Sequence, residues 1–264
     1  EILGVMGPID PLFFEIRPKG EKPDQYTSKE LLDQEEPLLF TYFGIKGLGE
    51  QIRMLLAEAG ADYDSVLVFG SVDQEHAMQW KKRSANGLLP MISGWGISRT
   101  TPISQSGAII RFLARKLGMY GTSVLEEAVI DCFYETVKDL ADHNTLICAS
   151  DPEKDYSIAK LPFATGRCVE KMLKVMPDPK DDTVAVNFAQ IYLVTILMQC
   201  EATRSGCVAE NLGPTLDQFC RDMVQRPRIS AFLQSPACLP YTRKELEQSD
   251  SYTFDAPIIR GSMK

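Results

Sequence analysis

The sequence has few of the residues that metal and redox sites require. Among its 264 residues there are only two histidines, His76 and His143, and neither has metal-ligand spacing around it. The first cysteine is Cys132, and none of the seven cysteines belongs to a Cys-x-x-Cys pair. A histidine-rich metal site and a thioredoxin-type redox centre are therefore not expected.

The cysteines also indicate a compartment. Their number, seven, is odd, and their scattered positions suit free thiols in a reducing environment better than a disulfide framework. The chain begins at Glu1 and shows no signal peptide. We therefore expect a cytoplasmic protein, or one that lies in an organelle after removal of a presequence.

An excess of positive charge and long apolar runs are missing too. The net charge is −8 and the isoelectric point is near 5.0, whereas nucleic-acid binders carry a basic face. No apolar run reaches the roughly 18 residues that a membrane span needs. The sequence predicts neither nucleic-acid binding nor a transmembrane segment.

Four regions follow one another along the chain. Residues 1–36 contain four prolines and mixed charges, and we interpret them as an N-terminal extension. Apolar periodicity predicts a mixed α/β domain over 37–120, an all-helical domain over 121–242 and a polar tail over 243–264.

The α/β domain is predicted to run strand, helix, strand, helix, strand, strand, helix, which is the thioredoxin-like plan. Its strands are expected at 38–42, 63–68, 89–92 and 99–102, and its helices at 52–59, 74–84 and 104–117. The helices of the second domain are expected at 126–142, 161–175, 184–200, 216–224 and 229–233. The helix at 184–200 is nearly all apolar, so we expect it at the centre of its domain.

Several motifs, in order and spacing, resemble those of the cytosolic glutathione transferases that use a tyrosine. Phe40 to Arg53 resembles the family's first strand, loop and helix, Leu89-Pro90 its cis-proline segment, and Gln105 to Ala114 its Gln-Ser motif and third helix. Leu161-Pro162-Phe163 and Pro227 to Leu233 resemble parts of its helical domain. The resemblance, which leans toward the mu and sigma classes, implies a thioredoxin-like domain that binds glutathione as co-substrate, followed by an all-helical domain.

Tyr42 is the candidate catalytic residue. The glutathione thiol must lose its proton to attack an electrophile, and a free thiol with a pKa of about 8.5 is mostly protonated at neutral pH. A phenol O–H that donates to the sulfur stabilises the thiolate through a charge-assisted hydrogen bond. The alternative is that Tyr42 is an ordinary core tyrosine at the end of a strand.

Leu89, Pro90, Gln105 and Ser106 are candidate glutathione ligands. If the Leu89–Pro90 bond is cis, the resemblance implies that the Leu89 backbone pairs with the glutathione peptide; the alternative is an ordinary trans proline. Gln105 and Ser106 begin a helix, where the N–H groups and the dipole favour the γ-glutamyl carboxylate. The alternative for Ser106 is simple N-capping.

Trp80 and Asp131 enter through the resemblance alone. Trp80 matches a tryptophan at the glycyl end of the glutathione site, but the lysine expected four residues later is Ser84 here. Residues 81–83 are basic and can substitute, unless they form only a solvated helix face. Asp131 falls where the partner subunit of a homodimer often supplies an acid to the glutathione amine; the alternative is a solvated helix residue.

The sequence departs from the family at three places. Leu48 replaces an arginine that tunes the tyrosine in some classes, and Leu88 replaces a polar residue before Leu-Pro. The best match to the family's capping box in the helical domain is Val184 with Asn187, which fits poorly. Asp182 or Thr183 is the alternative cap.

Two functions of different kinds follow. The first is a homodimeric enzyme that activates the glutathione thiolate through Tyr42 for conjugation to a small-molecule electrophile, or for isomerisation. Its electrophile site is expected between the domains, near residues 44–49, Tyr134, Asp139 and the C-terminal tail. The alternative is a non-catalytic subunit with the same fold, serving as a structural or interaction element of a larger assembly, such as an organellar one. The long termini and the poorly matched cap favour this alternative.

Overall fold

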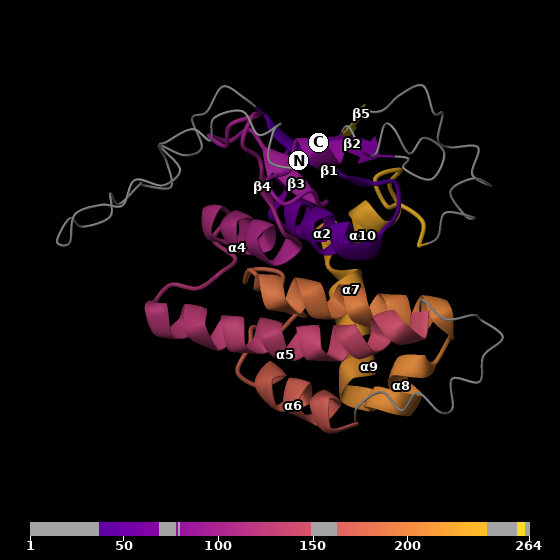
Figure 1. Cartoon of the computed structure of the whole chain (residues 1–264). Coiled ribbons are helices and arrows are strands. Elements are labelled where there is room, and N and C mark those ends of the chain that lie inside the picture. The colour runs from indigo at the N-terminus through magenta and orange to yellow at the C-terminus, as the bar shows by residue number, and fades with distance from the viewer. Residues whose placement is uncertain (1–36, 69–77, 79, 149–162, 242–257, 262–264) are drawn as a thin grey trace.

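The computed structural model describes residues 37–68, 78, 80–148, 163–241 and 258–261. The N-terminal extension, residues 74–77 and 79 of the helix expected at 74–84, the start of the helix expected at 161–175 and most of the tail lie outside the described residues. Figure 1 shows a strand-containing layer stacked on a layer of helices.

The first domain is built on a five-stranded sheet of order β4-β3-β1-β2-β5. Its strands are β1 (Leu38–Phe43), β2 (Tyr63–Val68), β3 (Met91–Ser93), β4 (Ile103–Ser104) and β5 (Ile258–Gly261). β1 and β2 are parallel, and the other neighbouring pairs are antiparallel. The thioredoxin-like plan is confirmed by the first four strands.

Two strands differ from the prediction. The strand expected at 99–102 is wrong in position: it lies at β4, because Pro102 has no N–H to give to a strand ladder and pairing begins after it. β5 comes from the predicted tail and pairs with β2, which the sequence does not predict.

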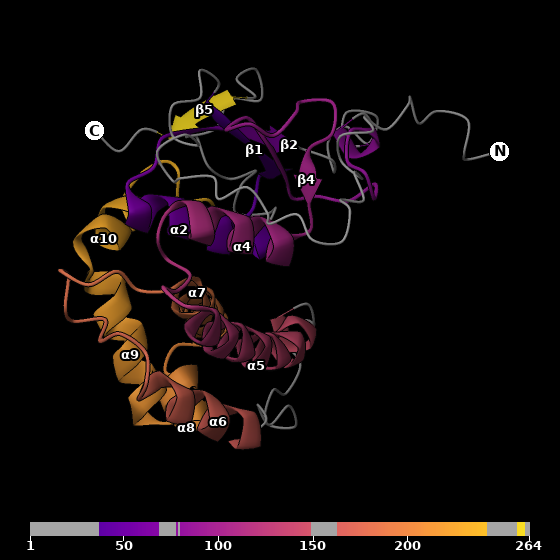
Figure 2. The same cartoon turned by 90° about the vertical axis from the view of Figure 1, so that its left-hand side faces the viewer.

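Helices α2 (Glu50–Ala59) and α4 (Ser106–Lys116) cover the sheet face that looks toward the helical domain (Figure 2). A single 3-10 turn, Gly47–Gly49, leads from the loop after β1 into α2. α2 ends at Gly60, whose φ of 67° gives the left-handed C-cap that the sequence predicts. Met78 and residues 80–82 are also helical.

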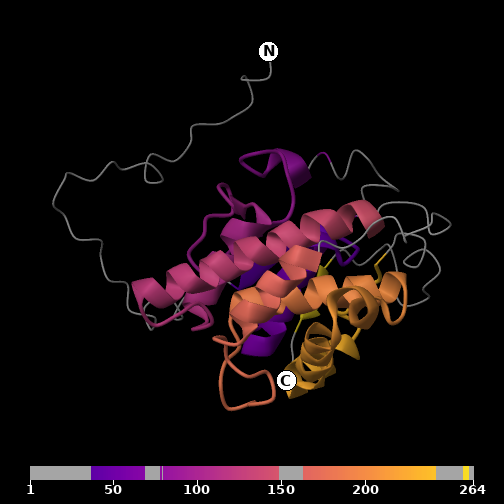
Figure 3. The same cartoon turned by 90° about the horizontal axis from the view of Figure 1, so that it is seen from below.

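All regular elements of the second domain within its described residues are helices. Its helices are α5 (Val124–Cys148), α6 (Phe163–Leu173), α7 (Phe188–Thr203), α8 (Cys207–Leu212), α9 (Pro214–Gln225) and α10 (Pro227–Leu233). α5 and α7 lie side by side (Figures 1 and 3), and α7 is buried along most of its length, as predicted. Within the described part of the chain, no helix is both long and apolar enough to cross a membrane.

Helix α7 begins with a capping box that the sequence analysis misplaced. The Asn187 side-chain oxygen accepts hydrogen bonds from the N–H groups of Ala189 at 3.1 Å and Gln190 at 3.0 Å. The Gln190 side chain accepts in return from the Asn187 N–H at 3.1 Å. The predicted pairing of Val184 with Asn187 is therefore wrong, because Asn187 is itself the N-cap and its partner is Gln190, three residues later. The box is complete because an asparagine and a glutamine side chain can each accept a backbone N–H, as the box requires.

A buried ion pair joins the two domains. Arg226, between α9 and α10, lies 2.6 Å from the Glu58 carboxylate at the end of α2, and their side chains are 4% and 8% exposed. The Arg226 guanidinium also donates to the carbonyl oxygens of Pro179, Asp181 and Val184, at 2.9, 3.0 and 3.1 Å. One side chain thus ties α2 to the loop that precedes α7.

Replacing Arg226 by methionine should lower the free energy of unfolding by about 3–5 kcal/mol, because the Glu58 carboxylate stays buried without its cation. Urea titration measures this loss. The matched control is Arg221→Met on α9, where Arg221 pairs with Asp217 at the surface and its loss should cost less than about 1 kcal/mol. Equal losses in the two variants would contradict the tie between the domains.

Candidate functional site

Strand register brings the predicted site residues to one end of the sheet. The last paired row of β1, β3 and β4 holds Thr41, Met91 and Ser104. One step further along each strand stand Tyr42, Pro90 and Gln105. The candidate catalytic residue, the proline segment and the start of α4 therefore meet at the same edge of the first domain.

Tyr42 is buried, with 6% of its surface exposed, and its hydroxyl oxygen accepts a hydrogen bond from the Leu48 N–H at 3.1 Å. Burial raises the pKa of Tyr42, although the Leu48 N–H and the positive charge of Arg53 oppose that rise. The phenol is therefore protonated at neutral pH. Because its oxygen already accepts from Leu48, its own proton can be donated to a ligand atom.

Glycines let the loop after β1 close over the Tyr42 ring. A Cβ atom at Gly49 would lie 2.4 Å from Cδ1 of Tyr42, and one at Gly47 would lie 2.8 Å from its hydroxyl oxygen. Gly47 also has a φ of +42°, which side chains rarely adopt. The glycines of the predicted motif are thus required by the close approach of backbone and ring.

Arg53 fixes the loop from beneath, a role that the sequence analysis did not predict. The side chain is 1% exposed, and its guanidinium donates to the carbonyl oxygens of Phe43, Ile45 and Lys46 at 3.3, 3.2 and 3.4 Å. It also pairs with Glu50 at 3.0 Å. An arginine inside the apolar stripe of an amphipathic helix is the signal that could have identified it.

The same guanidinium lies 5.9 Å from the Tyr42 ring and 5.4 Å from the ring of Phe40. Leu48, which replaces the arginine of some classes, is 51% exposed on the surface of the loop after β1. The positive charge near Tyr42 therefore comes from Arg53, within the protein, and the Leu48 position adds an apolar surface.

The segment after α10 also contacts the loop. The Lys46 N–H donates to the Pro240 carbonyl oxygen at 2.9 Å, and the Lys46 ammonium lies 4.0 Å from the centre of the Tyr241 ring. The end of the predicted helical domain thus lies against residues 44–49, and the electrophile site expected nearby stays a prediction.

The Leu89–Pro90 peptide bond is cis, as expected from the motif. Leu89 is half-buried and packs with Trp80 against a small apolar cluster formed by Val66 and Val68. Trp80 therefore lies on the Leu89 side of the site, and its place at the glycyl end of glutathione stays a prediction. Leu88 is 51% exposed, so the position of the family's polar residue faces solvent with an apolar side chain.

The basic residues after Trp80 flank aromatic rings. The Arg83 guanidinium lies 4.9 Å from the Trp80 ring, and the Lys81 ammonium lies 5.8 Å from the Phe43 ring. Ser84 is buried and donates to the Asn86 side chain at 2.8 Å. Lys81, Lys82 and Arg83 all stay candidates for the role of the missing lysine.

Gln105 has a φ of 75°, an uncommon conformation for a residue with a side chain. Ser106 is the first residue of α4, and no side-chain hydrogen bond caps this helix end. Simple capping by Ser106 is therefore not observed. An outlying backbone at a helix start with no side-chain cap supports an anion site there.

Asp131 has partners within its own chain. Its carboxylate accepts from Arg111 Nε at 2.7 Å and from the Tyr120 hydroxyl at 2.6 Å. Partial burial opposes ionisation, but these two hydrogen bonds hold the pKa of Asp131 below its usual value. The residue therefore belongs to a network between α4 and α5, and its contact with glutathione across a dimer stays a prediction.

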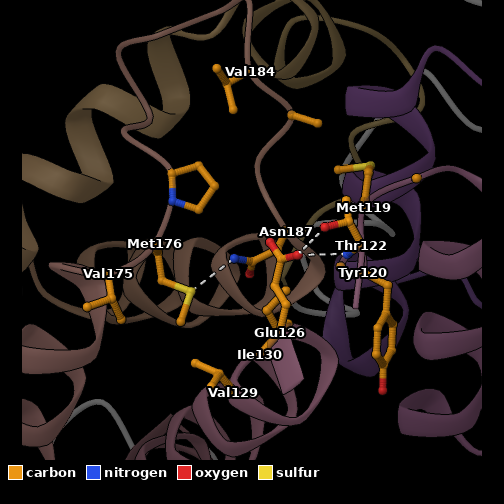
Figure 4. A pocket seen from close by; sticks show the side chains of 14 residues that line it. Met119, Tyr120, Thr122, Glu126, Val129, Ile130, Val175, Met176, Val184 and Asn187 are labelled. Atoms are coloured by element: carbon orange, nitrogen blue, oxygen red, sulfur yellow. Dashed lines mark hydrogen bonds between the residues drawn. The ribbon is translucent and has the colours of Figure 1, made fainter. Parts of the chain in front are cut away.

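A cavity of about 250 Å³ lies elsewhere, with walls from the segments around residues 120, 129, 176 and 185. Figure 4 shows Asn187 at its side, where the amide donates to the Met176 sulfur at 3.1 Å. None of its lining residues comes from β1 or from residues 44–49. Among the described residues, no group of histidine, cysteine and acidic side chains is arranged to hold a metal ion.

Comparison with known proteins identifies relatives of the whole fold. Residues 39–115 match the model of the glutathione S-transferase N-terminal domain. Glutathione S-transferase A2 of Homo sapiens is 30% identical over 226 residues, covering 81% of this chain and 96% of that relative. Glutathione S-transferase P of Caenorhabditis elegans is 31% identical over 213 residues, covering 76% and 94%.

Among solved structures, the pi-class glutathione S-transferase of Onchocerca volvulus is similar with a TM-score of 0.63 at 25% identity, covering 79% of this chain and 98% of that one. These relatives carry the names A, P and pi, so the expected lean toward the mu and sigma classes stays a prediction.

Gly49→Ala tests the fit between the loop and Tyr42. The new methyl group collides with the ring, so the free energy of unfolding should fall by about 1–3 kcal/mol. In a Tyr42→Ala background the obstacle is gone, and the cost of Gly49→Ala should nearly vanish. A double-mutant cycle by urea titration measures this coupling; additive losses would contradict the contact.

Proposed function

The chain belongs to the glutathione S-transferase family, and we propose that it binds glutathione beside Tyr42 and activates the thiol for attack on a small-molecule electrophile. One observation carries the proposal. The Tyr42 hydroxyl accepts from the Leu48 N–H and so has its proton to donate, at the sheet edge where α4 begins.

The chemistry needs a donor that stays protonated while the thiol ionises. Since burial raises the pKa of Tyr42, the phenol keeps its proton at pH 7. Its O–H donates to the sulfur and stabilises the thiolate more than the thiol, which lowers the thiol pKa. The thiolate is the nucleophile, and it forms the new bond to the electrophile.

The remaining contacts follow from the two ends of glutathione. The γ-glutamyl carboxylate binds at the start of α4, to Ser106 and the N–H groups there, beside Gln105. The peptide backbone pairs with the Leu89 backbone before Pro90, and the glycyl end reaches Trp80. In a homodimer, Asp131 of one subunit approaches the glutathione amine bound to the other.

The non-catalytic alternative is weaker than the sequence alone indicates. One argument for it was a poorly matched cap in the helical domain, but Asn187 and Gln190 form a complete capping box.

The six cysteines with described side chains are all free thiols, which suits the cytoplasm or another reducing compartment.

Tyr42→Phe removes only the hydroxyl. Glutathione affinity, measured by calorimetric titration, should stay within about threefold, because the hydrogen bond between the phenol and the sulfur contributes little to the binding of glutathione before the reaction. The turnover number with an aryl electrophile should fall about 10–100-fold, the loss of one hydrogen bond to a charged atom. Equal turnover in the variant would remove Tyr42 from its role.

Ser106→Ala should weaken glutathione binding about 10–100-fold, because it removes a hydrogen bond to a carboxylate. The control is Ser123→Ala: Ser123 accepts from the Glu126 N–H at 3.2 Å at the start of α5, so it is a serine that does cap a helix. Calorimetry should show unchanged affinity in the control. Unchanged affinity in Ser106→Ala would contradict the carboxylate site.

A further inference from the structure

Three hydrogen bonds in series connect the helical domain to the Tyr42 hydroxyl. The Tyr134 hydroxyl on α5 donates to Oε1 of Gln51 at 3.1 Å. The Gln51 amide Nε2 donates to the Leu48 carbonyl oxygen at 3.4 Å, and the Leu48 N–H donates to the Tyr42 hydroxyl oxygen at 3.1 Å. We call this series the Tyr134–Tyr42 relay.

The first half of the relay is rigid. Gln51 is 1% exposed and Tyr134 is 3% exposed, so water does not compete for their hydrogen bond. The Tyr134 ring packs 5.2 Å from the Phe188 ring and 4.9 Å from the Tyr192 ring, centre to centre. Burial raises the pKa of Tyr134 to about 12, so its hydroxyl stays a donor throughout the working pH range.

The second half of the relay needs this support. Leu48 lies between Gly47 and Gly49, which lack side chains to restrain the backbone, and its own side chain is 51% exposed. Arg53 holds the carbonyl groups before Leu48, at residues 43, 45 and 46. The bond from Gln51 holds the Leu48 carbonyl itself.

Tyr134 also lies beside the other half of the proposed site. A Cβ atom on Gly107, in the first turn of α4, would be 3.6 Å from the Tyr134 hydroxyl oxygen. The Arg111 guanidinium, one turn further along α4, lies 4.6 Å from the centre of the Tyr134 ring. One side chain of the helical domain is therefore near both the start of α4 and the loop over Tyr42.

We propose that Tyr134 and Gln51 are positioning residues, which orient the Leu48 peptide so that its N–H meets the Tyr42 hydroxyl. The catalytic consequence rests on the proposed function: a Tyr42 oxygen that accepts from Leu48 makes its O–H a stronger donor to the glutathione sulfur. Loss of the relay therefore raises the pKa of the bound thiol and leaves the groups that bind glutathione in place.

The first measurement uses the ligand-free full chain. Amide hydrogen exchange, followed by NMR, compares the Leu48 N–H with the Leu55 N–H in α2. In Tyr134→Phe, exchange at Leu48 should become about tenfold faster relative to Leu55, because a hydrogen bond that restrains the loop is lost. Tyr120→Phe is the matched control: its ring also stacks on Phe188, at 4.8 Å, but its hydroxyl bonds to Asp131, outside the relay.

A second variant is needed because Tyr134→Phe leaves the buried Gln51 amide oxygen without its donor, which can unfold the protein. Tyr134→Phe with Gln51→Met replaces both polar partners by apolar groups of similar size, which is nearly neutral for stability. The double variant should give the same faster exchange at Leu48. Unchanged exchange at Leu48 in the folded variants would overturn the relay.

The second measurement titrates the thiol of bound glutathione by the ultraviolet absorbance of the thiolate. The relay variants should raise its pKa by about 0.5–1 unit relative to the unaltered chain, and Tyr120→Phe should not. A thiol pKa that is lowered in the unaltered chain and unchanged in the relay variants would overturn the positioning role. Bound glutathione that titrates like free glutathione in the unaltered chain would instead contradict the proposed function, while the exchange result still decides the relay.

Discussion

The buried guanidinium of Arg53 is the constraint on which the rest of the site depends. It donates hydrogen bonds to three carbonyl oxygens, one at the end of β1 and two in the loop that follows, and so holds that loop around the Tyr42 ring. Glycine leaves the backbone free to adopt many conformations, so a loop rich in glycine needs hydrogen bonds to hold it in one. Without Arg53, these carbonyl groups would each need another partner. Glu50, one turn earlier in the same helix, balances the charge.

The surface of the same loop differs from that of some family classes. In some classes an arginine stands at the position of Leu48, and the resemblance implies that it tunes the tyrosine. Here Arg53 supplies a positive charge from within, and Leu48 contributes its backbone N–H and an apolar side chain. The expected consequence is a mouth of the site that suits apolar electrophiles better than charged ones.

Much of the fold could be predicted because the strongest elements are periodic and long. β2 occupies the predicted span, and α7 is the apolar helix that the sequence indicates. α8 was missed because a helix of six residues is too short to show a period. β5 was missed because a four-residue strand at the end of the chain is defined only by its pairing with distant β2.

The site was predicted unevenly, for physical reasons. Tyr42, the cis bond before Pro90 and the start of α4 belong to motifs of neighbouring residues, and such motifs can be recognised in a single sequence. Arg53 has only an indirect signal, its place in the apolar stripe of α2. The contacts that Arg53 and Gln51 make with backbone groups and with the second domain are not encoded by any spacing in the sequence. Asp131 likewise acquires Arg111 and Tyr120 as partners only when α4 and α5 pack together.

The most direct test of the account is a crystal structure of the chain with glutathione bound. The account predicts that the sulfur lies about 3.0–3.5 Å from the Tyr42 hydroxyl oxygen, with the γ-glutamyl carboxylate at the first turn of α4 and the Leu48 N–H still on Tyr42. Glutathione bound with its sulfur turned away from Tyr42, or bound elsewhere on the molecule, would contradict it.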